Sequence, residues 1–413
     1  MSTLRDALRR FDGQRRCWTA GLERSLLAWL ARRGKLPASN QPPQRILIIR
    51  STNRIGNNLF LLPFLQQVRR AHPFAEIELV CSGGQLLPFL GDKQLQRIHQ
   101  IRLQGKHLIP ALPRLWHLRR QHYDSVYVPF ASSTDHLIAA WVRASEKVGF
   151  DDARGDVLFD RLIAPDTHCH YAHQPLQLLG MHASQADQIE LGSQLHAACP
   201  HLTALAQAHL GRPLIGFFTG ARKGKGLSLP QWQRLLGDLR RHSPDALLIQ
   251  LTDPASPLPP LGDMQVSLHT LSELTRFTGG LTLFVSCDTG PLHLAAASGV
   301  PCLGLFTQTD PARYGCLGAR HLNQVVDDPN AIALDAHWLA ETLARQQTPR
   351  ERQAPLSHVQ YQQASWALLL DGTGLPLGVK TGGQSQPFSR QDPENMKRNN
   401  DSAGYPPAMM PYR

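Results

Sequence analysis

One stretch in the second half of the chain constrains the fold more than any other. Residues 281–287 are mostly apolar and predict a buried strand. Residues 288–290, Asp-Thr-Gly, break that strand. Pro291 suits the first turn of a short helix, and Gly299 ends it. Residues 302–306 are apolar again, so the order strand, turn, helix, strand predicts one unit of a parallel α/β sheet.

The turn at residues 288–290 has the properties of an anion-binding site. It lies where the carboxyl end of a strand meets a helix N-terminus, so backbone N–H groups and the positive end of the helix dipole favour an anion. Gly290 permits close approach to the backbone, Thr289 adds a hydroxyl, and His293 follows one turn later. We predict a phosphate or diphosphate here. The alternative is an Asx-type turn without a ligand.

The same alternation of strands and helices extends through most of the chain. It predicts an α/β fold whose parallel sheets are covered by helices on both faces. Helices are predicted at 229–242 and 271–277. The remaining strands are predicted within the ranges 45–50, 75–80, 99–103, 123–130, 147–150, 213–220 and 246–251.

Polar loops follow several of these strands at their carboxyl ends. The loop at 51–58, with Arg50, Arg54 and Gly56, either holds an anion or is an ordinary strand-to-helix connection. The loop at 221–226 follows Thr219 and carries glycines and lysines, yet it is neither a P-loop nor a Gly-x-Gly-x-x-Gly fingerprint. With the loops at 288–290 and 306–313, it predicts one composite site in the second half.

Charge and cysteine content narrow the function classes. The 413 residues carry a net charge of +11, which favours acidic partners such as phosphorylated sugars or anionic lipid. No RNA- or DNA-binding signature occurs, so we predict no nucleic-acid partner. Seven cysteines without a Cys-x-x-Cys pair indicate reduced thiols in the cytoplasm. His168, Cys169, His170 and His173 match no zinc spacing, so neither a metal nor a cofactor is predicted.

The two ends of the chain differ in composition from its middle. Residues 1–44 form a basic amphipathic extension, in which tryptophans and leucines recur at helical spacing. Its apolar face either lies on an anionic membrane surface or packs on the protein body. Residues 370–413 are polar and rich in Gly, Pro, Ser, Gln and Asn, so a disordered tail is predicted.

Several of these residues carry a family resemblance. The block Asp288-Thr-Gly-Pro-Leu-His293, followed by Gly299-Val-Pro301, is similar to the C-terminal signature of glycosyltransferase family 9, the bacterial lipopolysaccharide heptosyltransferases. In the first half, Ile46–Arg50 and Ile55-Gly56 agree with the family, and Gly220-Ala221 with a following lysine resembles its third motif. The resemblance covers residues 45–345.

The resemblance implies a fold, a reaction and two substrates. The fold is GT-B, in which two Rossmann-like domains face each other across a cleft. Residues 45–190 would bind the acceptor, a lipopolysaccharide core or related glycan, and residues 191–350 would bind a nucleotide-diphosphate sugar such as ADP-heptose. Transfer in the family is inverting and independent of metal. A cytoplasmic protein, peripheral on the inner membrane, is the expected setting.

The resemblance also assigns roles to single residues. Lys225, or else Lys223, would neutralise the charge of the leaving diphosphate. Asp288 would hold sugar hydroxyls. The donor-binding residues would be Thr219, Lys223, Asp288, Thr289, Gly290 and His293, and the acceptor-binding residues Arg50, Arg54 and Gly56.

Two positions depart from the family pattern. Asn57 stands where the family has the aspartate that deprotonates the acceptor, and an amide cannot accept that proton. A positioned base contributes about 10² to 10⁴ in rate, so a substitute is needed. Asp135 is our candidate, although it also suits the first turn of a helix. The second departure is the proline-rich segment at 250–257. Family members often carry an acid near here that binds the nucleotide ribose, and Asp253 is the only nearby carboxylate in this sequence.

Because Asn57 cannot act as the general base, two other functions are alternatives to glycosyl transfer. One is a non-catalytic GT-B protein that binds or assembles glycans. The other is a nucleotide-sugar epimerase or hydrolase that uses a similar two-domain cleft.

Overall fold

The structure is a computed structural model of the chain. It describes residues 21–38, 41–52, 54–83, 95–103, 107–181, 189, 191, 199–221, 224–252 and 259–345. The predicted tail at 370–413 lies outside these residues, as do Lys223 and Asp253.

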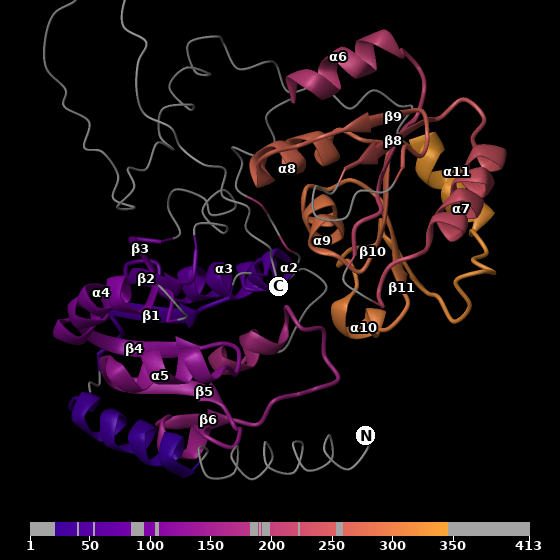
Figure 1. The fold of residues 1–413 in the computed structure, drawn as a ribbon. Coiled ribbons are helices and arrows are strands. Elements are labelled where there is room, and N and C mark those ends of the chain that lie inside the picture. Colours follow the sequence, from indigo (N-terminus) through magenta and orange to yellow (C-terminus); the bar gives the residue numbers. More distant parts are fainter. Residues whose placement is uncertain are drawn as a thin grey trace, which may run out of the picture. The chain divides into compact units, whose positions relative to one another are not determined.

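The first half of the chain forms a six-stranded parallel sheet (Figure 1). Its order is β3-β2-β1-β4-β5-β6. β1 pairs with β2 on one side and with β4 on the other, with Ile46 opposite both Ile77 and Ser125. The strands are β1 (Arg45–Arg50), β2 (Glu76–Cys81), β3 (Arg97–Gln100), β4 (His122–Val128), β5 (Arg143–Phe150) and β6 (Arg161–Ile163).

The second half repeats this architecture. Its sheet has the order β12-β11-β10-β7-β8-β9, and all five pairings are parallel. Read from β9, the order is that of the first sheet, with β7 in the place of β1 and β10 in the place of β4. The strands are β7 (Leu214–Phe218), β8 (Leu247–Leu251), β9 (Met264–Val266), β10 (Leu283–Cys287), β11 (Cys302–Phe306) and β12 (Leu322–Val325).

Helices cover both faces of the first sheet, and its central strands are therefore buried on both sides. One face packs against α2 (Ile55–Leu59), α3 (Leu62–Ala71) and the 3₁₀ helix η4 (Gln174–Leu179). The other face packs against α4 (Leu108–Arg120), α5 (Ser133–Trp141) and the helix at 21–34. A short 3₁₀ turn, η3 (Gly155–Val157), precedes β6.

The second sheet is covered in the same manner. On one face lie α7 (Leu229–His242) and α11 (Ala336–Arg345), and Trp232 and Leu239 of α7 are fully buried there. On the other face lie α8 (Leu271–Gly279) and α9 (Gly290–Ala297), with Phe277 and Leu292 in the core. Two further helices are α6 (Pro200–Ala208) and α10 (Pro311–Tyr314).

The described part of the N-terminal extension packs on the first sheet. In the helix at 21–34, Leu27 and Leu30 are buried in the same cluster as Leu47 and Ile49 of β1. Arg154 bonds Glu23 at 3.2 Å, which ties the helix to the loop after β5. Leu22, Leu26 and Trp29 remain exposed on the other side. Among the described residues, no helix is both long and apolar enough to cross a bilayer.

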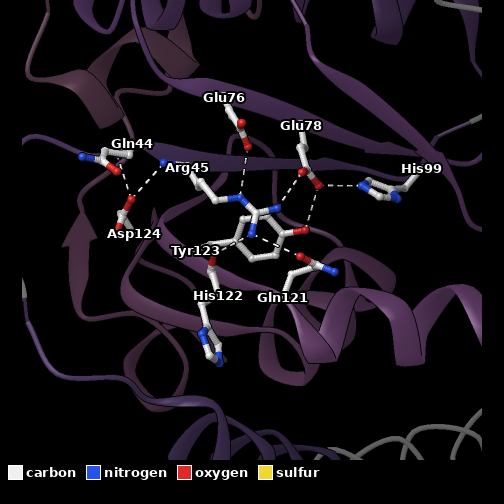
Figure 2. Close-up of polar contacts among 9 residues, drawn as sticks. All are labelled: Gln44, Arg45, Glu76, Glu78, His99, Gln121, His122, Tyr123 and Asp124. Carbon is white, nitrogen blue, oxygen red and sulfur yellow. Dashed lines mark hydrogen bonds and ion pairs between the residues drawn. The ribbon is translucent and has the colours of Figure 1, made fainter.

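A buried polar network connects the first four strands at their amino ends (Figure 2). The Glu78 carboxylate accepts hydrogen bonds from Arg45 at 2.9 Å and from the Tyr123 hydroxyl at 2.9 Å, and it contacts His99 Nε2 at 2.7 Å. Arg45 also pairs with Glu76 at the strand edge. Because both oxygens of the Glu78 carboxylate have partners, the charge is tolerated in the interior.

The strand orders locate the functional edge of each half. In an open α/β sheet, ligands bind beyond the carboxyl ends of the two strands at which the order reverses. These strands are β1 and β4 in the first sheet and β7 and β10 in the second. The segments that follow β1, β4, β7 and β10 are therefore the candidates for a functional site.

Candidate functional site

An ion-pair cluster lies at the switch point of the second sheet. Lys225, from the loop after β7, places Nζ 2.6 Å from Asp288 Oδ2, directly after β10. Thr309, from the loop after β11, donates its hydroxyl to the same oxygen at 2.8 Å. His293 Nε2 lies 3.1 Å from Asp288 Oδ1. The structure thus brings together three loops that are far apart in the sequence.

Burial and hydrogen bonding fix the charge of this cluster. Burial raises the pKa of the Asp288 carboxyl, but the hydrogen bonds from His293 and Lys225 outweigh it and hold the pKa well below its ordinary value. Burial likewise lowers the pKa of His293, yet its hydrogen bonds with Asp288 and the Cys316 thiol raise the pKa to about 9. At neutral pH these shifts keep Asp288 as a carboxylate and His293 as a protonated imidazole.

The N-terminus of α9 is adjacent to this cluster. Thr289 is the N-cap: its hydroxyl accepts a hydrogen bond from the Leu292 N–H at 3.4 Å and lies 2.9 Å from the Ser286 hydroxyl. The Thr289 side chain therefore serves the helix itself, a role that the anion-site prediction did not include. The Asp288 N–H bonds to Leu305 in the sheet. The helix begins at Gly290, one residue before the predicted start, and Pro291 lies in its first turn as predicted.

Local geometry explains the glycine before Lys225. Gly224 has φ +89°, a left-handed conformation that side chains disfavour, and a Cβ there would lie 2.8 Å from Gln308 Nε2. The Thr307 hydroxyl also bonds the Lys225 carbonyl at 3.1 Å, which fixes the loop against the segment after β11. Thr219, at the end of β7, is buried. The structure thereby fixes Lys225 in direct contact with Asp288.

Residues predicted for the acceptor side lie against α9. A Cβ on Gly56 would be 3.1 Å from His293 Cδ2, and one on Gly290 would be 3.3 Å from Ile55 Cβ. The Phe60 ring also contacts the His293 imidazole, with centroids 4.9 Å apart. A side chain at either glycine would therefore require the neighbouring helix to shift by a few tenths of an ångström.

The other acceptor-side candidates differ in exposure. Arg54 is exposed and Asn57 is partly exposed. Arg50 is buried, with its guanidinium 4.0 Å from the centre of the Phe130 ring. Its carbon stem and planar head thus fill the interior behind the loop at 51–58, which makes it a support for that loop more than an open anion-binding group.

Asp135 has a different environment from the one that a direct base requires. It lies in the first turn of α5, where the Ser132 hydroxyl caps its N–H, in agreement with the helix-start interpretation. Its side chain is completely buried and accepts hydrogen bonds from the Ser51 N–H, at 2.7 Å, and from the Ser51 hydroxyl. Asp135 therefore cannot touch an acceptor itself.

A cavity of about 530 Å³ extends along α9. Its walls include His293, Ala296, Ala297 and the loop from Gly315 to His321. His293 therefore both lines this cavity and contacts Asp288. Among the described residues, no three His, Cys, Asp or Glu side chains gather as metal ligands do.

A family comparison agrees with this geometry. The model of glycosyltransferase family 9 (heptosyltransferase) matches residues 266–338, which include Asp288, His293 and Thr309. Over this segment the chain is similar to family 9. The predicted resemblance is therefore confirmed over these residues, and the family that they match is one of glycosyltransferases. No curated protein sequence matches the chain.

Solved structures confirm the predicted GT-B fold. A family 9 glycosyltransferase from Veillonella parvula is similar with a TM-score of 0.57 and 16% identity, covering 79% of this chain and 97% of that one. Escherichia coli heptosyltransferase WaaC, solved with ADP, gives 0.54 and 18%, covering 73% and 99%. E. coli ADP-heptose lipopolysaccharide heptosyltransferase II gives 0.53 and 15%, with the same coverage.

Sequence reasoning missed three contacts. Thr309 lies in the loop at 306–313, which the sequence predicts as part of the site, but no sequence pattern predicts its hydrogen bond to Asp288. Ser51 was likewise inside a predicted functional loop. The Cys316 contact with His293 had no sequence signal, because Cys316 lies in the connection before an unpredicted edge strand.

Proposed function

We propose that the protein transfers a sugar, heptose from ADP-heptose, to a hydroxyl of a lipopolysaccharide core or a related glycan. The observation that carries the proposal is the Lys225–Asp288–His293 cluster beside the N-terminus of α9. It combines two cations with a helix N-terminus at a switch point, which is the chemistry that a nucleoside diphosphate requires.

Each residue of the cluster has a role in this reaction. Asp288 fixes the direction of the Lys225 ammonium group, whose remaining N–H bonds point to the leaving diphosphate. The acceptor oxygen attacks the anomeric carbon from the opposite face, which inverts that centre, while the bond to the diphosphate breaks and negative charge grows beside Lys225. A preorganised cation stabilises this charge, which is the role that a metal would otherwise have.

Nucleotide binding tests the donor half of this proposal. We expect ADP at 100 times its Kd to add about 2.7 kcal/mol of stability, which corresponds to a rise in Tm of roughly 3 °C for a chain of this length. AMP should give much less, because it has one phosphate for Lys225 and the α9 N-terminus. Differential scanning fluorimetry with ADP, AMP and UDP gives the comparison.

The same series separates the alternatives. A shift with ADP together with radiolabelled transfer from ADP-heptose to a truncated core supports the enzyme. A shift without turnover on any core in the panel would favour a non-catalytic binding protein instead. If no nucleoside diphosphate raised Tm, the donor site proposed here would be wrong.

We further propose that the protein acts at the anionic surface of the inner membrane. The helix at 21–34 presents Leu22, Leu26 and Trp29 to solvent, and Arg33 stacks on Trp29 at 4.2 Å. An apolar strip flanked by arginines suits the boundary between acyl chains and anionic headgroups.

Vesicle co-sedimentation checks this placement. Wild type should sediment with vesicles that contain phosphatidylglycerol and much less with pure phosphatidylcholine, and salt should weaken the binding. A double variant, Leu26→Ser with Trp29→Ser, should lose most of it, whereas Leu210→Ser, at a still more exposed leucine outside this helix, should not. Equal binding of both variants would contradict the proposal.

A further inference from the structure

The switch point of the first sheet contains a buried acid that no role accounts for. Asp135 follows β4 and Ser51 follows β1, the two strands at which the sheet order reverses. This is the position that Lys225 and Asp288 occupy in the second sheet. One Asp135 oxygen accepts both Ser51 hydrogen bonds, and the other, Oδ2, is buried with no hydrogen-bond partner.

Ser51 is the connection between this acid and the outside. It is partly exposed, whereas Asp135 has none of its surface exposed. Its loop leads into α2, where the Asn58 amide donates to the Thr52 carbonyl at 3.3 Å, and α2 packs against α9. The Ser51 hydroxyl is therefore on the loop that borders the donor site.

We infer that Ser51 and Asp135 form a proton relay that replaces the missing base at Asn57. This inference rests on the glycosyl transfer proposed above. Ser51 Oγ accepts the proton of the acceptor hydroxyl while its own proton passes to Asp135 Oδ1. The acceptor oxygen then uses its electron pair to bond the anomeric carbon, and the bond to the diphosphate breaks with its electrons on the diphosphate. Asp135 afterwards returns its proton to solvent through Ser51.

The surroundings of Asp135 suit a group that gains a proton. Burial raises the pKa of the Asp135 carboxyl, and the Ser51 hydrogen bonds offset this only in part. The charged or titratable neighbours that the described residues place near it are Arg50 on β1 and His136 on α5. Burial lowers the pKa of both. Arg50 nevertheless stays cationic, so its charge balances the carboxylate before the transfer.

Transfer kinetics with ADP-heptose and truncated core acceptors test the relay. Ser51→Ala should lower kcat by about 10² or more, with little change in the ADP-induced rise in Tm. Ser51→Thr keeps a hydroxyl and should recover most of the rate. Asn57→Asp, placed in the Ser51→Ala background, should restore activity because it supplies a base by the other route. Ser133→Ala, an exposed hydroxyl in the same segment, serves as the matched control.

The pH profile distinguishes a relay from a structural role. The acidic limb of kcat in wild type should reflect Asp135, and in the Ser51→Ala, Asn57→Asp variant it should move to lower pH, since a more exposed carboxylate then accepts the proton. Asp135→Asn should match Ser51→Ala in kcat if it folds. A Ser51→Ala enzyme with wild-type kcat and acidic limb would overturn the relay alone. A wild type without transfer to any core would overturn the proposed function, and the relay with it.

Discussion

Lys225→Met should reduce kcat/KM for sugar transfer by about 10³, a loss typical of removing one preorganised charge partner of a leaving group. The Lys225 ammonium group lies in the loop after β7, and its Nζ is 2.6 Å from Asp288 Oδ2. Methionine keeps the length of the side chain but has no charge. Folding should be unaffected, since Lys225 is partly exposed. Steady-state transfer kinetics, with circular dichroism as a folding check, measure the effect.

A second lysine provides a matched control for this prediction. Lys35 forms an ion pair with Asp160 at 2.5 Å, a length close to that of the Lys225 pair, and it lies outside the site. Lys35→Met should leave kcat/KM within about twofold of wild type, because a surface ion pair contributes little. If Lys225→Met and Lys35→Met behaved alike, charge stabilisation by Lys225 would have to be abandoned.

Glu78→Gln should destabilise the protein by about 3 to 5 kcal/mol at pH 7, as expected when one partner of a buried charged network is removed. The amide cannot accept hydrogen bonds from Arg45, His99 and Tyr123 together, so buried donors lose their partners (Figure 2). Glu76→Gln is the control, since Glu76 contacts the same arginine at 3.3 Å but is more than half exposed. It should cost less than about 1 kcal/mol. Urea unfolding of the two variants gives both values, and equal values would refute the network's importance.

The same carboxylate predicts how wild-type stability depends on pH. Burial raises the pKa of Glu78, but the hydrogen bonds from His99, Tyr123 and Arg45 outweigh it and lower the pKa from 4.5 to about 2. Because the folded protein holds this proton less tightly than the unfolded chain, the contribution is complete above pH 4.5 and is lost as the pH falls toward 2. Its size is about 3 kcal/mol. Glu78→Gln should remove this part of the acid dependence, which unfolding curves at pH 3 and 7 would reveal.

Central strands could be predicted closely, and edge strands could not. The prediction at 302–306 matches β11 (Cys302–Phe306), and the helix predicted at 229–242 matches α7. These segments are buried along their length or along one face, so their sequence pattern is strong. β9, β12 and β6 were missed because each is short and partly exposed, and β12 contains Asn323 and Gln324. β3 begins two residues earlier than the predicted strand at 99–103.

The N-terminal extension shows why composition left two interpretations open. Leucines at helical spacing are equally suited to a membrane surface and to a protein core. The structure divides them: Leu27 and Leu30 are buried, while Leu22 and Leu26 are exposed. Packing on the protein body is therefore confirmed for one side of this helix, and the exposed side is the one that we propose for the membrane surface.

The sequence by itself determined the type of fold and the loops that carry the chemistry, because apolar periodicity and strand-end glycines are local properties. It marked Lys225, Asp288 and Asp135 separately. Only the tertiary structure decided their partners. Lys225 meets Asp288 across 63 residues because β10 lies beside β7, and Ser51 meets Asp135 across 84 residues because β4 lies beside β1. Strand order is a property of the whole sheet, so no local pattern could have paired these residues.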